Sequence, residues 1–299
     1  MKQHFNQLRG SMLLLLTSMI WGAAFVAQSA GMDYIGPFTF NGLRMLMGAA
    51  VLLPFLLKRR TGTPAAASER KTLLTGGILC GIALFIGSTL QQIGIVDTTA
   101  GKAGFITAMY VVLVPVMGVF VGHKQPWLVW LGVALSAVGM YFLCVHESLS
   151  LNQGDLMVLA GAVGFSFHIL LIDRYSAHVD GVKLSCLQFF VAGVLGLVCM
   201  FLFETPQFSQ IFAAWLPLLY AGVFSCGVAY TLQILGQRDT DPTIASMILC
   251  LEAVFSVIFS WFLLGERLSA REIFGCVLIF AAILLAQLKG KAQEPKTES

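Results

Sequence analysis

Charged residues are scarce in this sequence. Asp, Glu, Lys and Arg make up 11% of its 299 residues, whereas an average soluble domain carries roughly 25%. Hydrophobic residues make up 58%, and the mean hydropathy is +0.84. A soluble domain of this size has too little interior to bury so much apolar surface, so the composition indicates a membrane protein. The net charge is only +3 and the basic residues form no single stripe, which argues against nucleic-acid binding.

Motifs that would indicate an enzyme are also missing. No Gly-x-x-x-x-Gly-Lys-Ser/Thr loop occurs, so ATP is not expected to drive the protein. There is no His-Glu-x-x-His motif and no Cys-x-x-Cys pair. The seven cysteines lie singly inside apolar runs, where cysteine usually packs as a small apolar residue. We therefore expect no catalytic residue, no metal site and no cofactor.

What the sequence does contain is a series of long apolar segments. A membrane-crossing helix needs about 20 mostly apolar residues. Ten segments approach or reach that length, near 11–30, 36–57, 72–92, 103–122, 126–145, 154–173, 184–203, 212–235, 243–264 and 271–288. They predict ten transmembrane helices.

The basic residues predict the orientation of these helices. When alternate loops are assigned to opposite sides, fourteen Lys and Arg residues fall on the N-terminal side and three on the other. Lys and Arg are enriched in cytoplasmic loops. We therefore expect a multi-pass protein of the bacterial inner (plasma) membrane, with residues 1–10 and the tail 289–299 both cytoplasmic.

One phrase occurs twice in the chain. Residues 89–98 read TLQQIGIVDT and residues 231–240 read TLQILGQRDT, an offset of 142. Over 89–121 and 231–263 ten of 33 aligned residues are identical, including a polar cluster that is unusual in membrane helices. Such self-similarity at one offset predicts an internal duplication.

The offset also predicts how the two copies are oriented. It spans five helices, an odd number, so the second copy must enter the membrane from the opposite side. The predicted fold is therefore an all-α integral membrane protein whose ten transmembrane helices form two inverted five-helix repeats, 11–146 and 154–288. Inverted repeats are typical of secondary transporters, whose substrate site lies near the midplane between the halves.

Longer stretches point the same way. They read MIWGAAFV, LRMLMGAAVLLP, AGFITAMYVVLVPVMG and LCLEAVFSVIFSWFLLGERLSAREIFGCVLIFAAILL. Over residues 10–288 the sequence resembles the EamA-type members of the drug/metabolite transporter superfamily. The resemblance implies a five-plus-five helix plan and export of small metabolites such as amino acids. Many relatives have proline where this chain has Ala253, so a proline break there is not expected.

Two ionisable residues are predicted to lie near the middle of the membrane. Arg44 falls in the second expected helix and Glu252 in the ninth. Charges at this depth are costly, and they usually mark a substrate pathway or a buried ion pair. The two residues could neutralise each other, or they could hold the two ends of a zwitterionic substrate. Glu252 is also a candidate carrier for H⁺ as the coupling ion.

Other polar and aromatic residues are candidates for the same pathway. Under the repeat, Tyr110 aligns with Glu252 and Gln188 approximately with Arg44. A histidine in a membrane helix can carry a proton, and amide side chains can either bind substrate or join helices. The candidates besides the two charged residues are Tyr110, His168, Gln188, Trp21, Gln91 and Gln233. We also consider Gln91 and Gln233 as a pair of gate positions.

Small residues and one proline give expectations about packing. Gly77-x-x-x-Gly81 and Gly118-x-x-x-Gly122 predict close helix contacts. Pro115 removes one helix hydrogen bond and predicts a kink in the fourth helix.

The favoured function is a secondary transporter that works by alternating access around a midplane cavity. A passive channel is an alternative, and an intramembrane enzyme is a weaker one, because pore loops, charged rings and catalytic groupings are not evident. The expected partners are a small-molecule substrate, H⁺ and the lipid bilayer. The choice between monomer and homodimer stays open.

Overall fold

The computed structural model describes residues 2–58, 67–98, 100–123, 125–144, 152–264 and 269–290, and every regular element in these ranges is helical. Helices suit so apolar a chain, because inside a bilayer the backbone must satisfy its own hydrogen bonds. The helices of the first half are α1 Lys2–Met32, α2 Pro37–Lys58, α3 Ala67–Asp97, α4 Ala100–Thr107, α5 Tyr110–Phe120 and α6 Trp127–Cys144. Those of the second half are α7 Gln153–Ser176, α8 Gly181–Phe203, α9 Phe208–Ala213, α10 Trp215–Leu219, the π-helix η1 Tyr220–Tyr230, α11 Thr231–Gln237, α12 Pro242–Leu249, α13 Leu251–Leu264 and α14 Ala270–Gly290.

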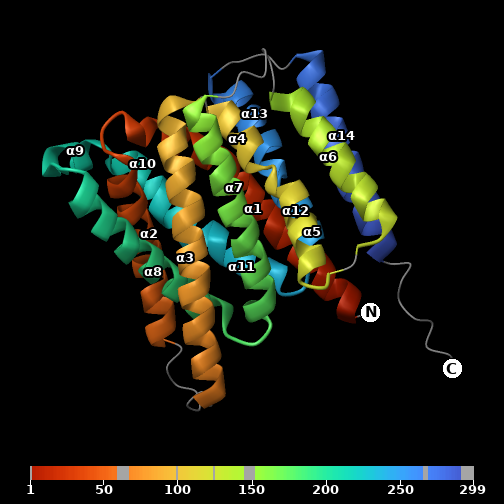
Figure 1. The fold of residues 1–299 in the computed structure, drawn as a ribbon, viewed down its shortest axis with the longest axis horizontal. Coiled ribbons are helices and arrows are strands. Elements are labelled where there is room, and N and C mark those ends of the chain that lie inside the picture. The colour runs from red at the N-terminus through yellow and green to blue at the C-terminus, as the bar shows by residue number, and fades with distance from the viewer. Residues whose placement is uncertain are drawn as a thin grey trace.

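These elements account for the ten predicted spans. In the described chain seven segments are long and apolar enough to cross a membrane, and three shorter apolar helices, Trp127–Phe142, Pro242–Ser256 and Ile273–Leu285, supply the rest. The predicted fold class, ten transmembrane helices in two inverted repeats, is confirmed. α1 begins and α14 ends on the same side of the molecule, as an even number of crossings requires (Figure 1). Of the predicted tail 289–299, residues from 291 onward lie outside the described part.

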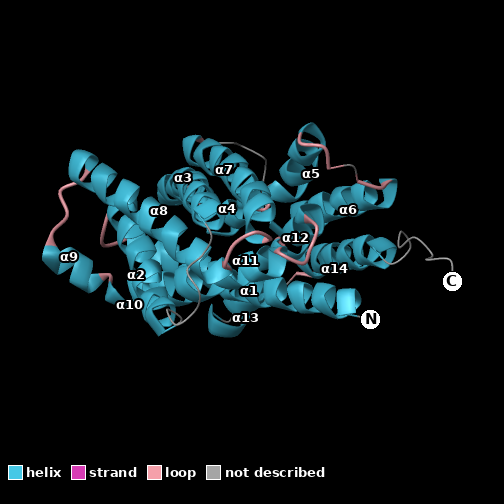
Figure 2. Cartoon of the chain, turned by 90° about the horizontal axis from the view of Figure 1, so that it is seen from below, coloured by secondary structure: helices cyan, strands magenta, loops and turns pink. Residues whose placement is uncertain are grey.

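The helices form two lateral pairs and a central group. α2 packs on α8 at one end of the molecule and α6 packs on α14 at the other, as both views show (Figures 1 and 2). Between these pairs, α7 packs on α3, and α1 packs on α11 and α13. The central group therefore combines helices from both repeats.

Glycines in the repeated phrase account for two of the central helix crossings. A Cβ atom on Gly94 of α3 would lie 2.5 Å from the carbonyl oxygen of Gly154 in α7, and one on Gly236 of α11 would lie 2.9 Å from that of Gly10 in α1. Gly10 and Gly154 also correspond under the repeat, at an offset of 144. The same backbone-to-backbone crossing is thus built twice, and each needs glycine because any side chain would collide with a backbone oxygen.

The fourth and ninth spans are both interrupted, and at equivalent positions. Ala108 and Met109 separate α4 from α5, and Cys250 separates α12 from α13. At each break the backbone forms a tight turn, with Val111 N–H donating to Ala108 O at 3.0 Å and Ala253 N–H donating to Cys250 O at 3.2 Å. The ninth span therefore breaks although it has alanine at 253.

The expectations about proline and glycine have different outcomes. Pro115 lies inside α5, and the fourth span is interrupted directly before Tyr110, at Ala108 and Met109, while the kink at Pro115 stays a prediction. Gly77 and Gly81 do pack closely, against Leu187 and Val191 of α8. Among the described residues, a Cβ on Gly118 would meet His123 at 3.5 Å and one on Gly122 would meet nothing within 4 Å, so this second pair forms no close helix crossing there. Gly122 instead ends α5 with a φ of +92°, a conformation that glycine adopts without strain.

Candidate functional site

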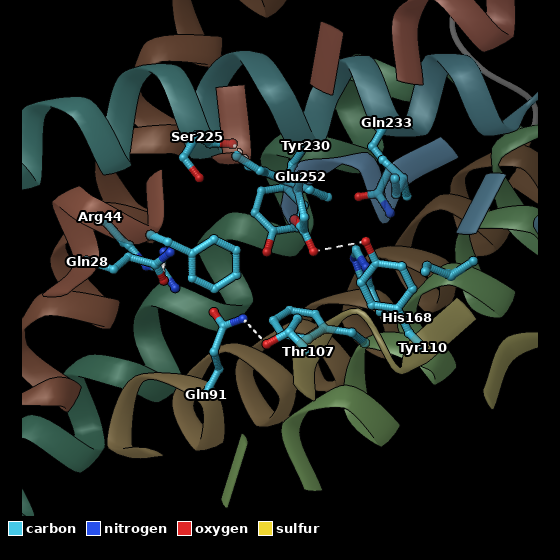
Figure 3. A pocket seen from close by; sticks show the side chains of 15 residues that line it. Gln28, Arg44, Gln91, Thr107, Tyr110, His168, Ser225, Tyr230, Gln233 and Glu252 are labelled. Carbon is cyan, nitrogen blue, oxygen red and sulfur yellow. Dashed lines mark hydrogen bonds between the residues drawn. The ribbon is translucent and has the colours of Figure 1, made fainter. Parts of the chain in front are cut away.

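A cavity lies among the central helices and is lined from both repeats. Its volume is about 40 Å³. Seven of the eight predicted pathway residues line it, and Figure 3 shows their side chains converging. The lining residues are Trp21, Phe25, Gln28, Arg44, Gln91, Thr107, Tyr110, Phe165, His168, Ile169, Ser225, Tyr230, Gln233, Leu249 and Glu252.

Arg44 reaches the cavity from α2 and is held by neutral groups. Its side chain is 2% exposed. Nε donates to Asn41 Oδ1 and Nη1 donates to Gln28 Oε1, each at 2.9 Å, while Nη2 has no hydrogen-bond partner in the described chain. The guanidinium carbon also lies 5.7 Å from the centre of the Phe40 ring. A guanidinium stays charged in proteins, so Arg44 brings a positive charge with one nitrogen left for a ligand.

The support behind Arg44 was not predicted. Asn41 Nδ2 donates to Ser88 Oγ at 2.9 Å and to Thr89 Oγ1 at 2.8 Å, which orients its carbonyl toward Arg44. Asn41 lies three positions before Arg44, so the two share one helix face. This spacing in the sequence could have indicated their contact. Thr89 opens the repeated phrase, and its counterpart Thr231 donates to Ser185 Oγ on α8 at 3.0 Å.

Glu252 enters the cavity from α13, directly after the helix break. Its side chain is 3% exposed, and its Oε1 accepts a hydrogen bond of 2.9 Å from the hydroxyl of Tyr110. These two residues are 142 positions apart, so this bond joins equivalent positions of the two repeats. Among the described residues Glu252 forms no ion pair with Arg44, although both line the cavity. Arg44 and Glu252 therefore do not neutralise each other directly in this structure.

His168 and Gln188 form a second polar contact. His168 Nε2 lies 2.9 Å from Gln188 Oε1, so Gln188 reaches the site through His168 and does not line the cavity itself. The His168 ring also meets Tyr230 edge-on, with 5.9 Å between ring centres. Trp21 packs against the same Tyr230 at 4.5 Å, and its indole N–H donates to Ser225 O at 3.4 Å. Tyr230 and Ser225, which were not among the predicted site residues, contact these side chains and help to position them in the cavity.

The two glutamines of the repeated phrase both face the cavity. Gln91 Nε2 donates to Thr107 Oγ1 at 2.9 Å, whereas Gln233 Oε1 has no hydrogen-bond partner in the described chain. The glycines one helical turn further along form the crossings described above.

The cavity has groups that suit a ligand with both a positively and a negatively charged group. It offers a guanidinium nitrogen, a carboxylate and several amide and hydroxyl groups. A volume of about 40 Å³ accommodates only a few water molecules, since each needs roughly 10–15 Å³ by this measure. A metabolite therefore requires the residues around the cavity to move. The described residues contain no group of three His, Cys, Asp or Glu side chains that could hold a metal ion.

Inverted helical repeats around a polar cavity are typical of membrane transporters. Comparison with protein families gives the particular assignment. The EamA-like transporter family model matches residues 8–145 and 152–288, so the chain belongs to that family. The match comes once in each half of the molecule.

Individual relatives agree with this assignment. The chain is 33% identical over 285 residues to an uncharacterized transporter of Archaeoglobus fulgidus, covering 92% of this chain and 85% of the relative. It is 25% identical to the uncharacterized transporter YoaV of Bacillus subtilis, covering 91% and 94%. It is 24% identical to the uncharacterized inner membrane transporter YedA of Escherichia coli, covering 89% and 87%.

A solved structure shares the fold. A chain described only as "Crystal structure of protein" superposes with a TM-score of 0.78 at 18% identity, covering 96% of this chain and 99% of that one.

Proposed function

We propose that this protein is a secondary transporter that exports small zwitterionic metabolites, such as amino acids, by alternating access around the cavity. The observation that carries the proposal is the pair Arg44 and Glu252. Both are buried and line one cavity, yet they form no ion pair with each other. A substrate with a carboxylate and an ammonium group would satisfy both charges at once.

Each end of such a substrate has a suitable partner. The unpartnered Nη2 of Arg44 can donate to a carboxylate, and the Glu252 carboxylate can accept from an ammonium. Charge-assisted hydrogen bonds of this kind are roughly twice as strong as neutral ones. The binding free energy would also offset the cost of two buried charges.

The driving force in this proposal is a gradient and not ATP, because the chain has no ATP-binding loop. H⁺ carried by Glu252 is the candidate coupling ion. The proposed setting is the inner membrane, with both chain ends on the cytoplasmic side as the basic residues predict.

Counterflow tests the proposal. Proteoliposomes loaded with unlabelled amino acids are diluted into a mixture of radiolabelled proteinogenic L-amino acids, and we expect transient accumulation of label. Arg44→Gln should lower that accumulation about 10- to 100-fold, because hydrogen bonds to charged groups contribute about 1.5–3 kcal/mol. Arg174→Gln, the same change at an exposed position of α7, should leave it unaltered.

Two results would contradict the proposal. Equilibration without accumulation would indicate a passive channel. Equal counterflow by wild type and Arg44→Gln would remove Arg44 from the site.

A further inference from the structure

Besides Tyr110 and Glu252, the two repeats differ at a second pair of equivalent positions that line the cavity. Gln91 and Thr107 of the first repeat correspond to Gln233 and Leu249 of the second, at the offset of 142, and all four line the cavity. In the first repeat the pair is joined, because Gln91 Nε2 donates to Thr107 Oγ1 at 2.9 Å. In the second repeat leucine replaces the threonine and has no polar atom to offer.

Gln233 is buried, and its amide oxygen has no donor beside it in the described chain. The side chain is 1% exposed, and its Oε1 has no hydrogen-bond partner among the described residues. Buried polar atoms in native proteins are nearly always hydrogen-bonded, so each exception needs a reason. Figure 3 shows the Gln233 carboxamide directed into the cavity, so its oxygen is placed to accept a hydrogen bond from a molecule that enters there.

The chemistry of the surroundings indicates which part of a ligand Gln233 meets. An amide oxygen accepts hydrogen bonds, and so does the carboxylate of Glu252, which the second repeat also contributes. Arg44, the donor that suits a carboxylate, lies with Gln28 at the other end of the view in Figure 3. Hydrogen-bond donors of a ligand are therefore favoured on the side of Gln233 and Glu252.

We propose that Gln233 is a specificity-determining residue which, together with Glu252, selects substrates with a primary ammonium group over their N-methylated analogues. A primary ammonium has three N–H donors, enough for both Glu252 and Gln233, whereas a trimethylammonium group has none. This inference rests on the proposed transport of zwitterions and specifies the substrate class further.

Glycine and its N-methylated series provide the probes. Glycine, N-methylglycine, N,N-dimethylglycine and N,N,N-trimethylglycine share one carboxylate and lose donors stepwise. Their affinities for the detergent-purified protein are measured from ligand-dependent shifts in thermal unfolding, and their potency is measured as inhibition of amino-acid counterflow. We expect wild type to bind glycine at least about tenfold more tightly than trimethylglycine, the scale of one hydrogen bond to a charged group.

Three variants separate the role of Gln233 from the size of the ligand. Gln233→Met keeps the length of the side chain and removes its hydrogen bonds, so the preference for glycine should fall about tenfold. Leu249→Thr keeps Gln233 but places beside it a hydroxyl that can donate to its Oε1, and should reduce the preference similarly. Leu249→Val has nearly the shape of threonine without the hydroxyl, so its preference for glycine should stay well above that of Leu249→Thr. Size-exclusion profiles establish that each variant is folded.

The outcomes are distinct for the two proposals. An equal preference in wild type and Gln233→Met, or in Leu249→Thr and Leu249→Val, overturns the role of Gln233 while transport can stand. Loss of preference in Gln233→Met and Leu249→Thr supports it. A wild-type protein that shows this preference in binding but no counterflow would refute the transport proposal and leave the role of Gln233 intact.

Discussion

The two repeats share one scaffold and differ in the residues that face the cavity. Where the repeats hold helices together they keep the same residue type, as at Gly94 and Gly236 in the helix crossings and at Thr89 and Thr231 in the contacts with α2 and α8. These positions need a particular small shape or hydroxyl in both copies. They account for much of the repeated phrase that stands out in the sequence.

Facing the cavity, the equivalent positions have diverged. Tyr110 corresponds to Glu252 and Thr107 to Leu249. Arg44, which lines the cavity, corresponds approximately to Gln188, which reaches the cavity through His168. The first repeat contributes the guanidinium group of Arg44 and the second contributes the carboxyl group of Glu252. The two halves therefore present different chemistry to the cavity, although the surrounding helices are related by symmetry. Divergence at these few positions makes the lining of a duplicated scaffold asymmetric.

The third and eighth spans differ in backbone as well. Residues 78–88, within the uninterrupted helix α3, correspond to the π-helix η1 Tyr220–Tyr230. π-Helical turns are rare and are often found at functional sites. Here the π-helix carries Ser225 and Tyr230, which line the cavity.

Among substitutions at equivalent positions of the two repeats, we expect the largest effect at Glu252. Glu252→Gln keeps an acceptor for Tyr110 but removes the charge, so counterflow should fall about 10- to 100-fold, the scale of losing a hydrogen bond to an ionic group. Any remaining transport should no longer respond to an imposed pH gradient. Tyr110→Phe, the corresponding change in the other repeat, should cost only a few-fold because the carboxylate remains. Equal transport and an equal pH profile in Glu252→Gln and wild type would exclude the proposed role.

A second, smaller effect is expected at the duplicated helix crossings. Alanine at Gly94 or Gly236 would force a Cβ to within 2.5 or 2.9 Å of a backbone oxygen, and overpacking of this kind costs about 1–3 kcal/mol. Thermal unfolding should show Gly94→Ala as the more damaging change. Gly104→Ala is the control, since its Cβ would meet nothing nearer than 3.9 Å. Unfolding temperatures that do not differ among the three variants would refute the packing argument.

The two helix crossings also allow a test of whether the two ends of the central helix group open alternately. Single cysteines placed near Gly94 and near Gly236 report on the two ends of the central group. If the ends open alternately, substrate should change their labelling rates in opposite directions. A change in the same direction at both ends would contradict alternating access.

The smallest effect is expected where the ninth span is already broken. Ala253→Pro removes one N–H next to the break at Cys250, in the first turn of α13, where proline is tolerated, so it should cost less than about 1 kcal/mol. Ala282→Pro, in the middle of α14, should cost about 3 kcal/mol or more because it removes an intact helix bond. Similar losses of thermal stability in both variants would show that the break at Cys250 does not relieve the backbone.

Much of the architecture could be predicted because it follows from simple requirements. A bilayer demands apolar segments of a set length, and the odd number of helices in the offset requires inversion. The depth of Arg44 and Glu252 followed from their place in these segments. The helix breaks were not predicted from the sequence, because neither proline nor glycine stands at Ala108, Met109 or Cys250.

The sequence by itself determined the spans, the duplication and the two buried charges, since each depends on residue type and spacing along the chain. Only the tertiary structure decided that neutral amides hold Arg44, that Tyr110 bonds to Glu252 and that the Oε1 of Gln233 has no partner in the described chain. These contacts join helices far apart in sequence, and a hydrogen bond forms only within a few tenths of an ångström of its preferred length. Helix rotation and crossing angle set distances of that precision, and an apolar pattern that specifies membrane depth does not encode them.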